Sequence, residues 1–345
     1  MNESPILPVT YPLSAEGVAD LVRTSVPPRA AMPSASVGPA DGTVVAIGAF
    51  DGVHLGHRTL IDACVREARE RSVRSVVVTF DPDPSELIVG AQAEPRLLSI
   101  EDRVALCHSL GIDEVLVLAF DLTLAALSPE EFILLLEERL GSILTVHVGD
   151  NFHFGVHGSG NVATLSSLGA ARGFAVVSHP LDRLDGQPVS STRIRGLLAQ
   201  GKVEEAARLL GRCHFVRGSV DHGRGEGTSF GFPTANVRCP ARTCMPSEGV
   251  YACVVSDGTH AWPAAANVGT PPTFESRRDA CFLEANLLGF EGDLYGRELA
   301  VVFVAWLRAS RPFSSLEELE RTVLGNIDWV RKNVGASCVE VGRDH

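Results

Sequence analysis

Short, valine-rich apolar segments alternate with amphipathic ones between residues 42 and 212, and this pattern constrains the fold most strongly. Five apolar runs are the length of strands, and runs that can be buried on both faces are typical of parallel sheets covered by helices. The runs are residues 44–47, 76–80, 115–120, 146–149 and 174–177, and the helical patterns between them are residues 57–71, 100–110, 129–140 and 162–172. We therefore expect an α/β fold with a doubly wound parallel sheet, which binds ligands at the carboxyl ends of its strands.

The pattern changes after about residue 213. A helical stretch over residues 191–210 comes first, and short alternating strands with glycine- and proline-rich turns follow at residues 215–220, 250–255, 264–268, 281–288 and 299–307. This spacing predicts a small antiparallel β-barrel. A final helix is expected from Ser314 to about Lys332, with Glu317 completing a capping box, as Glu131 does after Ser128 and Pro129.

These two patterns divide the chain of 345 residues into two domains between an arm and a tail. The first forty residues hold seven prolines, so residues 1–41 are expected to be extended or poorly ordered, with a short helix near residues 15–23. Residues 42–212 form the first domain, residues 213–335 the barrel domain, and residues 336–345 the tail.

Charge and cysteine spacing exclude several classes of protein. The net charge is −12, which argues against nucleic-acid binding because that function depends on neutralising phosphates. The eight cysteines include no C-x-x-C pair and no zinc-site spacing, so they are interpreted as reduced thiols. The sequence contains neither a secretory signal pattern nor an apolar run long enough to span a bilayer. We expect a cytoplasmic protein that does not bind membranes.

Residues 48–57, GAFDGVHLGH, join the first predicted strand to the first predicted helix. Gly52 and Gly56 allow a ligand to approach the backbone closely. The start of a helix offers unpaired N–H groups to a phosphate. His54 and His57 lie three residues apart, near each other on the first turn, where they can donate to phosphate oxygens. The segment therefore predicts a nucleotide site.

Further motifs recur after other strands and in the C-terminal half. They are residues 79–84 (TFDPDP), 148–155 (VGDNFHFG), 190–195 (SSTRIR), 231–236 (GFPTAN), 267–274 (NVGTPPTF) and 283–296 (LEANLLGFEGDLYG). Together with residues 48–57, they resemble the motifs of the prokaryotic bifunctional riboflavin kinase/FMN adenylyltransferase family, also called FAD synthetase. The resemblance extends from about Gly42 to about Lys332. It implies a Rossmann-like nucleotidyltransferase domain followed by a riboflavin-kinase-like barrel.

For the first domain, the resemblance implies transfer of AMP from ATP to FMN, giving FAD and pyrophosphate. His54 and His57 would contact the ATP phosphates, and Asn151 would act with Asp81 on the flavin nucleotide and the transition state. The resemblance assigns further ATP or flavin contacts to Gly48, Phe50, Asp51, Gly52, Gly56, Ser191, Thr192 and Arg195. The protein would act by positioning and charge stabilisation, without a covalent intermediate.

For the second domain, the resemblance implies phosphorylation of riboflavin to FMN. Thr234 and Asn236 would hold Mg²⁺, whose preference is for oxygen ligands. Gly231, Pro233 and Asn236 would contact the nucleotide. Glu284 would be the general base that takes the proton of the riboflavin 5′-hydroxyl. The implied partners are the small molecules ATP, riboflavin and FMN; a homo-oligomer is possible.

The sequence departs from the family pattern mainly in the kinase half. Glu226 and Thr228 replace two arginines of a basic loop, and an acidic residue near a nucleotide phosphate repels it. Asn286 and Gly289 replace a histidine and an aspartate, the stretch after Arg308 lacks an acidic residue, and Asp83 replaces a histidine in the first domain. Two alternatives therefore stay open: a specialised paralogue that only adenylylates or acts on a flavin analogue, and a non-catalytic flavin-binding sensor.

Overall fold

The computed structural model describes residues 9–29, 40–221, 234–269 and 280–342 and divides the chain into two compact units. The sheet unit comprises residues 29–94 and 99–190, and the barrel unit comprises residues 1–28, 95–98 and 191–345. Residues 191–212 therefore group with the barrel, whereas the sequence pattern alone assigns them to the preceding domain. None of the helices in the described ranges is both long enough and apolar enough to cross a membrane.

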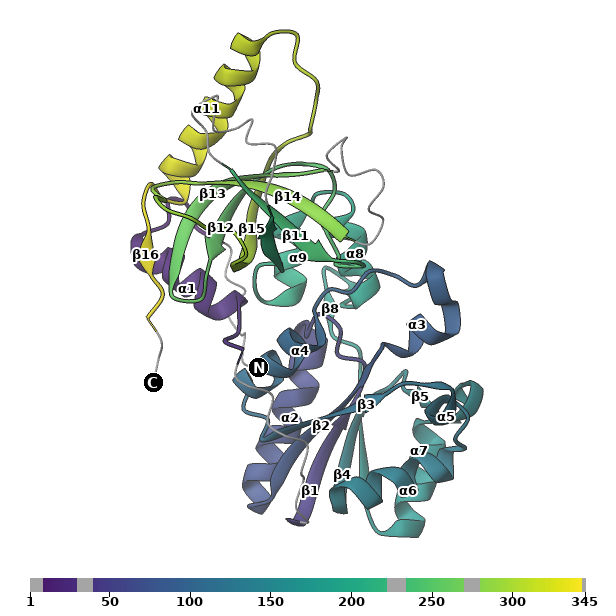
Figure 1. Cartoon of the computed structure of the whole chain (residues 1–345). Coiled ribbons are helices and arrows are strands. Elements are labelled where there is room, and N and C mark those ends of the chain that lie inside the picture. The colour runs from purple at the N-terminus through teal and green to yellow at the C-terminus, as the bar shows by residue number, and fades with distance from the viewer. Residues whose placement is uncertain (1–8, 30–39, 222–233, 270–279, 343–345) are drawn as a thin grey trace. The chain divides into compact units, whose positions relative to one another are not determined.

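The sheet unit contains a five-stranded parallel sheet in the order β3-β2-β1-β4-β7 (Figure 1). Its strands are β1 (Ala40–Ile47), β2 (Arg74–Asp81), β3 (Glu114–Ala119), β4 (Gly141–Gly149) and β7 (Ala175–His179). The predicted doubly wound sheet is thus confirmed. Chain order runs from β1 outward to β3 and then returns to β4 beside β1, so the topological switch point lies between β1 and β4.

Helices cover both faces of this sheet. Figure 1 shows α2 and α4 on one face and α6 and α7 on the other. The helices are α2 (Leu55–Arg71), α3 (Pro84–Val89), α4 (Ile100–Ser109), α5 (Leu122–Ala125), α6 (Pro129–Leu140) and α7 (Val162–Arg172). The Ser128–Glu131 capping box at the start of α6 forms as predicted. Buried side chains of α6, such as Ile133 and Leu136, join the strand residues in one apolar core.

Short elements complete the sheet unit. Two small ribbons pair β5 (His153–Phe154) with β6 (Gly160–Asn161) and β8 (Arg183–Leu184) with β9 (Gln187–Pro188), and two 3₁₀ turns span Gly90–Gln92 and Val156–Gly158. Asp83, the departure in the second motif, is the N-cap of α3 and forms a capping box with Glu86. Its carboxylate therefore stabilises the start of α3.

The barrel unit closes six antiparallel strands in the order β12-β15-β10-β11-β14-β13, because β12 also pairs with β13 (Figure 1). The strands are β10 (Phe215–Asp221), β11 (Ala235–Pro240), β12 (Gly249–Ser256), β13 (His260–Val268), β14 (Ala280–Leu287) and β15 (Glu298–Arg308), and β16 (Val339–Glu340) adds to β13. The predicted barrel is confirmed. The sequence pattern did not anticipate β11, which begins at the last two residues of the 231–236 motif and continues to Pro240.

The described residues of the barrel unit include the helices α1 (Ala15–Ser25), α8 (Ser191–Leu198), α9 (Val203–Leu210) and α11 (Leu316–Asn333). The expected continuous helix over residues 191–210 is wrong, because the chain turns at Gly201, whose φ is +77°. The expected cap at Glu317 is also wrong. Ser315 is the N-cap of α11, and its hydroxyl accepts from the amide of Glu318.

Candidate active sites

The first candidate site lies at the carboxyl edge of the parallel sheet, where β1 and β4 meet. His54 and His57 follow β1, Asp81 ends β2, and Asn151 follows β4. Parallel strands bring their carboxyl ends to one edge, so the topology gathers these four residues around the switch point.

The turn from β1 to α2 is held in an unusual backbone conformation. Phe50, Gly52 and Val53 all have positive φ angles, of 52°, 87° and 40°. Glycine adopts such angles freely, but Phe50 and Val53 do so at a cost that their complete burial offsets. A side chain at Gly48 would also crowd the Phe50 ring, because an added Cβ would lie 3.2 Å from it. Strain of this kind is common at functional sites, where the surrounding structure enforces it.

The two histidines of this turn form a stacked pair at the start of α2. His54 is the N-cap, and its Nδ1 accepts the backbone N–H of His57 at 3.3 Å, so a neutral His54 carries its proton on Nε2. The two rings stack with centroids 3.6 Å apart. Burial, followed by the nearby His54 and Arg103, holds the pKa of His57 well below its usual value. His57 Nδ1 is buried and has no hydrogen-bond partner within the described ranges.

Arg103 of α4 is a buried residue of this region that the sequence did not indicate. Its side chain is 1 % exposed and donates to Thr79 Oγ1 (3.2 Å) and to the carbonyl of Phe80 (3.1 Å). The Thr79 hydroxyl donates in turn to the carbonyl of Ala49 (2.9 Å). Arg103 also lies 4.0 Å from the buried carboxylate of Asp51. Asp51, predicted to contact a ligand, therefore takes part in an internal ion pair.

Asn151 lies in the exposed turn after β4. The amide of Asp150 donates to the carbonyl of His179 at the end of β7 (2.9 Å), and the carbonyl of Asn151 accepts from the His153 ring (2.9 Å). A Cβ at Gly149 would come within 3.0 Å of Asn151 Oδ1, so the side chain folds back toward the strand end. Asp81 is half-buried at the end of β2.

The predicted ATP contacts after residue 190 belong to the barrel unit. Ser191 and Thr192 open α8, and Arg195 follows on the same helix and donates from Nε to the carbonyl of Pro95 (2.7 Å). Their part in the site at the sheet edge stays a prediction.

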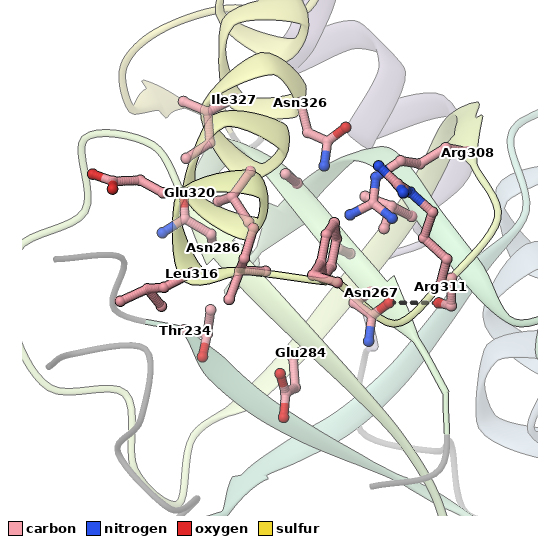
Figure 2. A pocket seen from close by; sticks show the side chains of 17 residues that line it. Thr234, Asn267, Glu284, Asn286, Arg308, Arg311, Leu316, Glu320, Asn326 and Ile327 are labelled. Carbon is pink, nitrogen blue, oxygen red and sulfur yellow. Dashed lines mark hydrogen bonds between the residues drawn. The ribbon is translucent and has the colours of Figure 1, made fainter. Parts of the chain in front are cut away.

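The second candidate site is a pocket of about 480 Å³ between the barrel strands and α11. Figure 2 shows Glu284 on a strand below α11 and Thr234 nearby, directly before β11, with Arg308 and Arg311 farther along the pocket. The apolar lining comes mainly from α11 and the chain before it: Phe313, Leu316, Leu319, Val323 and Ile327. A volume of this size with an apolar wall and a few polar groups suits a flat aromatic ligand.

Strand register brings the predicted metal and base residues together. Glu284 of β14 pairs directly with Asn236 of β11 on one side and with Asn267 of β13 on the other. Side chains alternate along a strand, so Thr234 shares the face of Asn236. Gly231 and Pro233, like the departures Glu226 and Thr228, lie outside the described residues. Pairing across strands explains why residues distant in the sequence converge here.

The opposite part of the pocket carries positive charge. Arg308 and Arg311 lie over the face of the Phe313 ring, at 5.5 and 5.1 Å from its centroid. Burial, followed by Arg311, lowers the pKa of Arg308. Ser310 donates to Asn267 Oδ1 (3.0 Å). Asn286, one of the departures from the family pattern, lines the pocket, as does Ser310 in the stretch after Arg308 that lacks an acidic residue.

The donors around Glu284 fit a magnesium ion carried by a nucleotide. A hydroxyl, two amides and a carboxylate supply the oxygen atoms that Mg²⁺ prefers. The described residues contain no cluster of three or more histidine, cysteine, aspartate or glutamate side chains that could hold a metal by themselves. Phosphate oxygens and water would therefore complete the coordination.

Comparison with known proteins matches each half of the chain to a family. Residues 38–193 match the FAD synthetase model, and residues 210–334 match the riboflavin kinase model. The bifunctional riboflavin kinase/FMN adenylyltransferase of Pseudomonas fluorescens is 40 % identical over 291 residues, covering 84 % of this chain and 92 % of that protein. The protein of the same name from Bacillus subtilis is 32 % identical over 287 residues, covering 81 % and 89 %.

A solved structure from Streptococcus pneumoniae, described as a macrolide-efflux protein, has a similar fold. It is 28 % identical, with a TM-score of 0.76 over 85 % of this chain and 95 % of that one. The similarity therefore extends over both the sheet and the barrel.

Proposed function

The chain belongs to the family of bifunctional riboflavin kinases/FMN adenylyltransferases, and we propose on this basis that it makes FAD from riboflavin in two ATP-dependent steps. The barrel phosphorylates riboflavin to FMN, and the sheet unit transfers AMP to FMN. The observation that carries the proposal is the cross-strand register of Glu284 with Asn236 and Asn267 beside the pocket. It supports an assembled kinase site despite the departures in sequence.

In the kinase step, the riboflavin 5′-hydroxyl oxygen attacks the γ-phosphorus of ATP. The new O–P bond forms as the bond to the β-phosphate oxygen breaks, and Glu284 accepts the hydroxyl proton. Thr234 and Asn236 would contact the nucleotide phosphates. Mg²⁺, brought with ATP, would screen the charge that builds on those phosphates. The apolar wall of α11 would hold the flavin ring and exclude water.

In the adenylyl step, an FMN phosphate oxygen attacks the α-phosphorus of ATP and pyrophosphate leaves. The amides of the first turn of α2 and the imidazole of His54 would stabilise the charge that develops in this step. The lowered pKa of His57 keeps its ring neutral at pH 7, so it donates a single hydrogen bond. Asn151 and Asp81 would orient FMN from the neighbouring strand ends.

The two half-reactions test the proposal separately. Purified protein receives Mg-ATP with riboflavin in one tube and with FMN in another, and the products are separated by chromatography. FMN and FAD from riboflavin support the bifunctional enzyme. Tight flavin binding without product in either tube would support the sensor instead.

A second candidate is an enzyme that adenylylates FMN but does not phosphorylate riboflavin. Asn286 in the pocket wall favours it, since it stands where the family pattern has a histidine. FAD from the FMN tube alone would select this candidate. Cytoplasmic location and self-association are further parts of our proposal that this experiment does not address.

A further inference from the structure

A row of polar side chains crosses the sheet unit and has no part in the chemistry above. His147 of β4 is 3 % exposed; its Nε2 lies 2.8 Å from Oε2 of Glu67 on α2. The other ring nitrogen, Nδ1, lies 2.9 Å from Nε2 of His179, the last residue of β7. These three residues, here called the histidine bridge, connect one helix with two strands.

Glu67 fixes the direction of the hydrogen bonds. Thr145 donates to its Oε1 at 2.6 Å, and Arg71 pairs with the same oxygen at 3.0 Å. Burial pushes the pKa of Glu67 upward, but the hydrogen bonds from Thr145 and His147 outweigh it and hold this pKa below its usual value. An ionised Glu67 requires a proton on His147 Nε2. His147 Nδ1 then accepts, and His179 Nε2 donates.

Both histidines are neutral in this arrangement. Burial is the first cause that lowers the pKa of each ring. Among the charged groups around them, Arg66 disfavours protonation of both rings, Glu67 favours protonation of His147, and Asp182 favours protonation of His179. Asp182 is itself tied to α2, because its carboxylate accepts from Thr59 (2.6 Å).

The end of the bridge is attached to the turn that carries Asn151. Gly149 and His179 are paired in the β4–β7 register, and the His179 carbonyl accepts the amide of Asp150 at 2.9 Å. Asp150 directly precedes Asn151. Displacement of His179 would therefore move the backbone from which Asn151 projects.

We propose that Glu67, His147 and His179 position the Asp150–Asn151 turn for adenylyl transfer, an inference that rests on the FAD-forming function proposed above. The bridge does not touch substrate. It anchors the end of edge strand β7 to buried β4 and to α2, the helix that begins with the His54–His57 pair. The bridge thereby holds the end of β7, the end of β4 and helix α2 in fixed positions relative to one another.

Steady-state kinetics of FMN adenylylation test the bridge. His147→Leu removes both hydrogen bonds, and we expect kcat to fall about 10- to 100-fold, as misplacement of a catalytic group by an ångström does. His147→Gln can donate to Glu67 and accept from His179, so it should recover most of kcat. His108→Gln in α4, outside the bridge, is the matched control and should leave kcat unchanged. Preserved hydrogen-exchange protection of the β2 amides, which belong to the same unit, reports that each variant is folded.

Amide hydrogen exchange provides a readout that does not depend on activity. His147→Leu should speed the exchange of the Asp150 amide at least tenfold, while amides in β2 keep their protection. If His147→Leu does not fold, His179→Phe and His179→Gln repeat the comparison at the half-buried end of the bridge. Normal kcat and normal Asp150 exchange in the Leu or Phe variant would overturn the proposal. A wild-type protein that makes no FAD would refute the function instead, and the exchange experiment would still decide whether the bridge holds the turn.

Discussion

Single histidines in this chain differ in role because their surroundings differ. His54 caps helix α2, His147 lies in a hydrogen-bonded row, and His214 is enclosed in the barrel unit, stacked on Phe303. A sequence shows the residue type but not its enclosure. The chemistry of each imidazole follows from what surrounds it.

Replacement of His54 by asparagine separates its two roles. Asparagine is among the best N-cap residues, so His54→Asn should keep the cap and change the free energy of unfolding by less than about 1 kcal/mol. The loss of the imidazole should lower kcat for FAD formation by about 10²- to 10³-fold, the usual effect of removing one donor to a developing charge. Urea unfolding and FMN adenylylation measure the two effects. Near-normal kcat would limit His54 to capping.

His214 predicts a pH-dependent stability. Burial lowers its pKa from 6.5 to about 4, although its bond to the Cys244 carbonyl opposes the shift. Between these two pKa values the unfolded chain binds the proton and the folded chain does not, so stability falls as pH decreases. From pH 7 to pH 5, this one residue should cost about 2 kcal/mol of unfolding free energy. Urea unfolding of the wild type and His214→Gln should show a shallower pH dependence in the variant; equal slopes would contradict the assignment.

At the scale of elements, the sequence predicted each strand or helix whose own residues showed a strand-like or helix-like pattern. The valine-rich runs and the Ser128 cap were sufficient for the sheet and for α6. Strand β11 was missed because its first two residues, Ala235 and Asn236, were interpreted only as part of a motif. Arg103 was missed because an arginine within a helix usually faces solvent, and its burial depends on partners from β2 and the β1–α2 turn. The histidine bridge joins three distant segments, which no local pattern reveals.

We expect the contacts of Arg103 with β2 and with the β1–α2 turn to stabilise that turn more than any other contact between elements. Arg103→Met removes the ion pair with Asp51 and the hydrogen bonds to Thr79 and Phe80, so we expect a loss of about 3–5 kcal/mol in unfolding free energy. Asp51→Asn combined with Arg103→Met also removes the carboxylate of that ion pair and should recover part of the loss. A double-mutant cycle by urea unfolding measures the coupling. Arg69→Met on the exposed part of α2 is the control and should change stability by no more than about 0.5 kcal/mol.

At the scale of the whole molecule, each compact unit carries one of the two proposed sites, with its own core. The sheet unit contains the histidine pair, and the barrel unit contains the pocket with Glu284. Separate cores allow one site to be disabled without the other. With separate sites, we expect FMN made in the barrel to be released and then rebound by any sheet unit.

Two disabled proteins should therefore complement each other in solution. Glu284→Gln should lose riboflavin phosphorylation by about 10²- to 10⁴-fold, the usual contribution of a general base, and keep adenylylation. His57→Ala should make FMN from riboflavin but no FAD.

A mixture of the two variants should convert riboflavin to FAD after a lag in which FMN accumulates. A phosphatase that destroys FMN should suppress the formation of FAD. The lag should lengthen on dilution, because FMN must first reach the concentration that the adenylylating site requires. If each variant retains its own half-reaction but the mixture yields no FAD, FMN must pass directly between the two sites of one molecule.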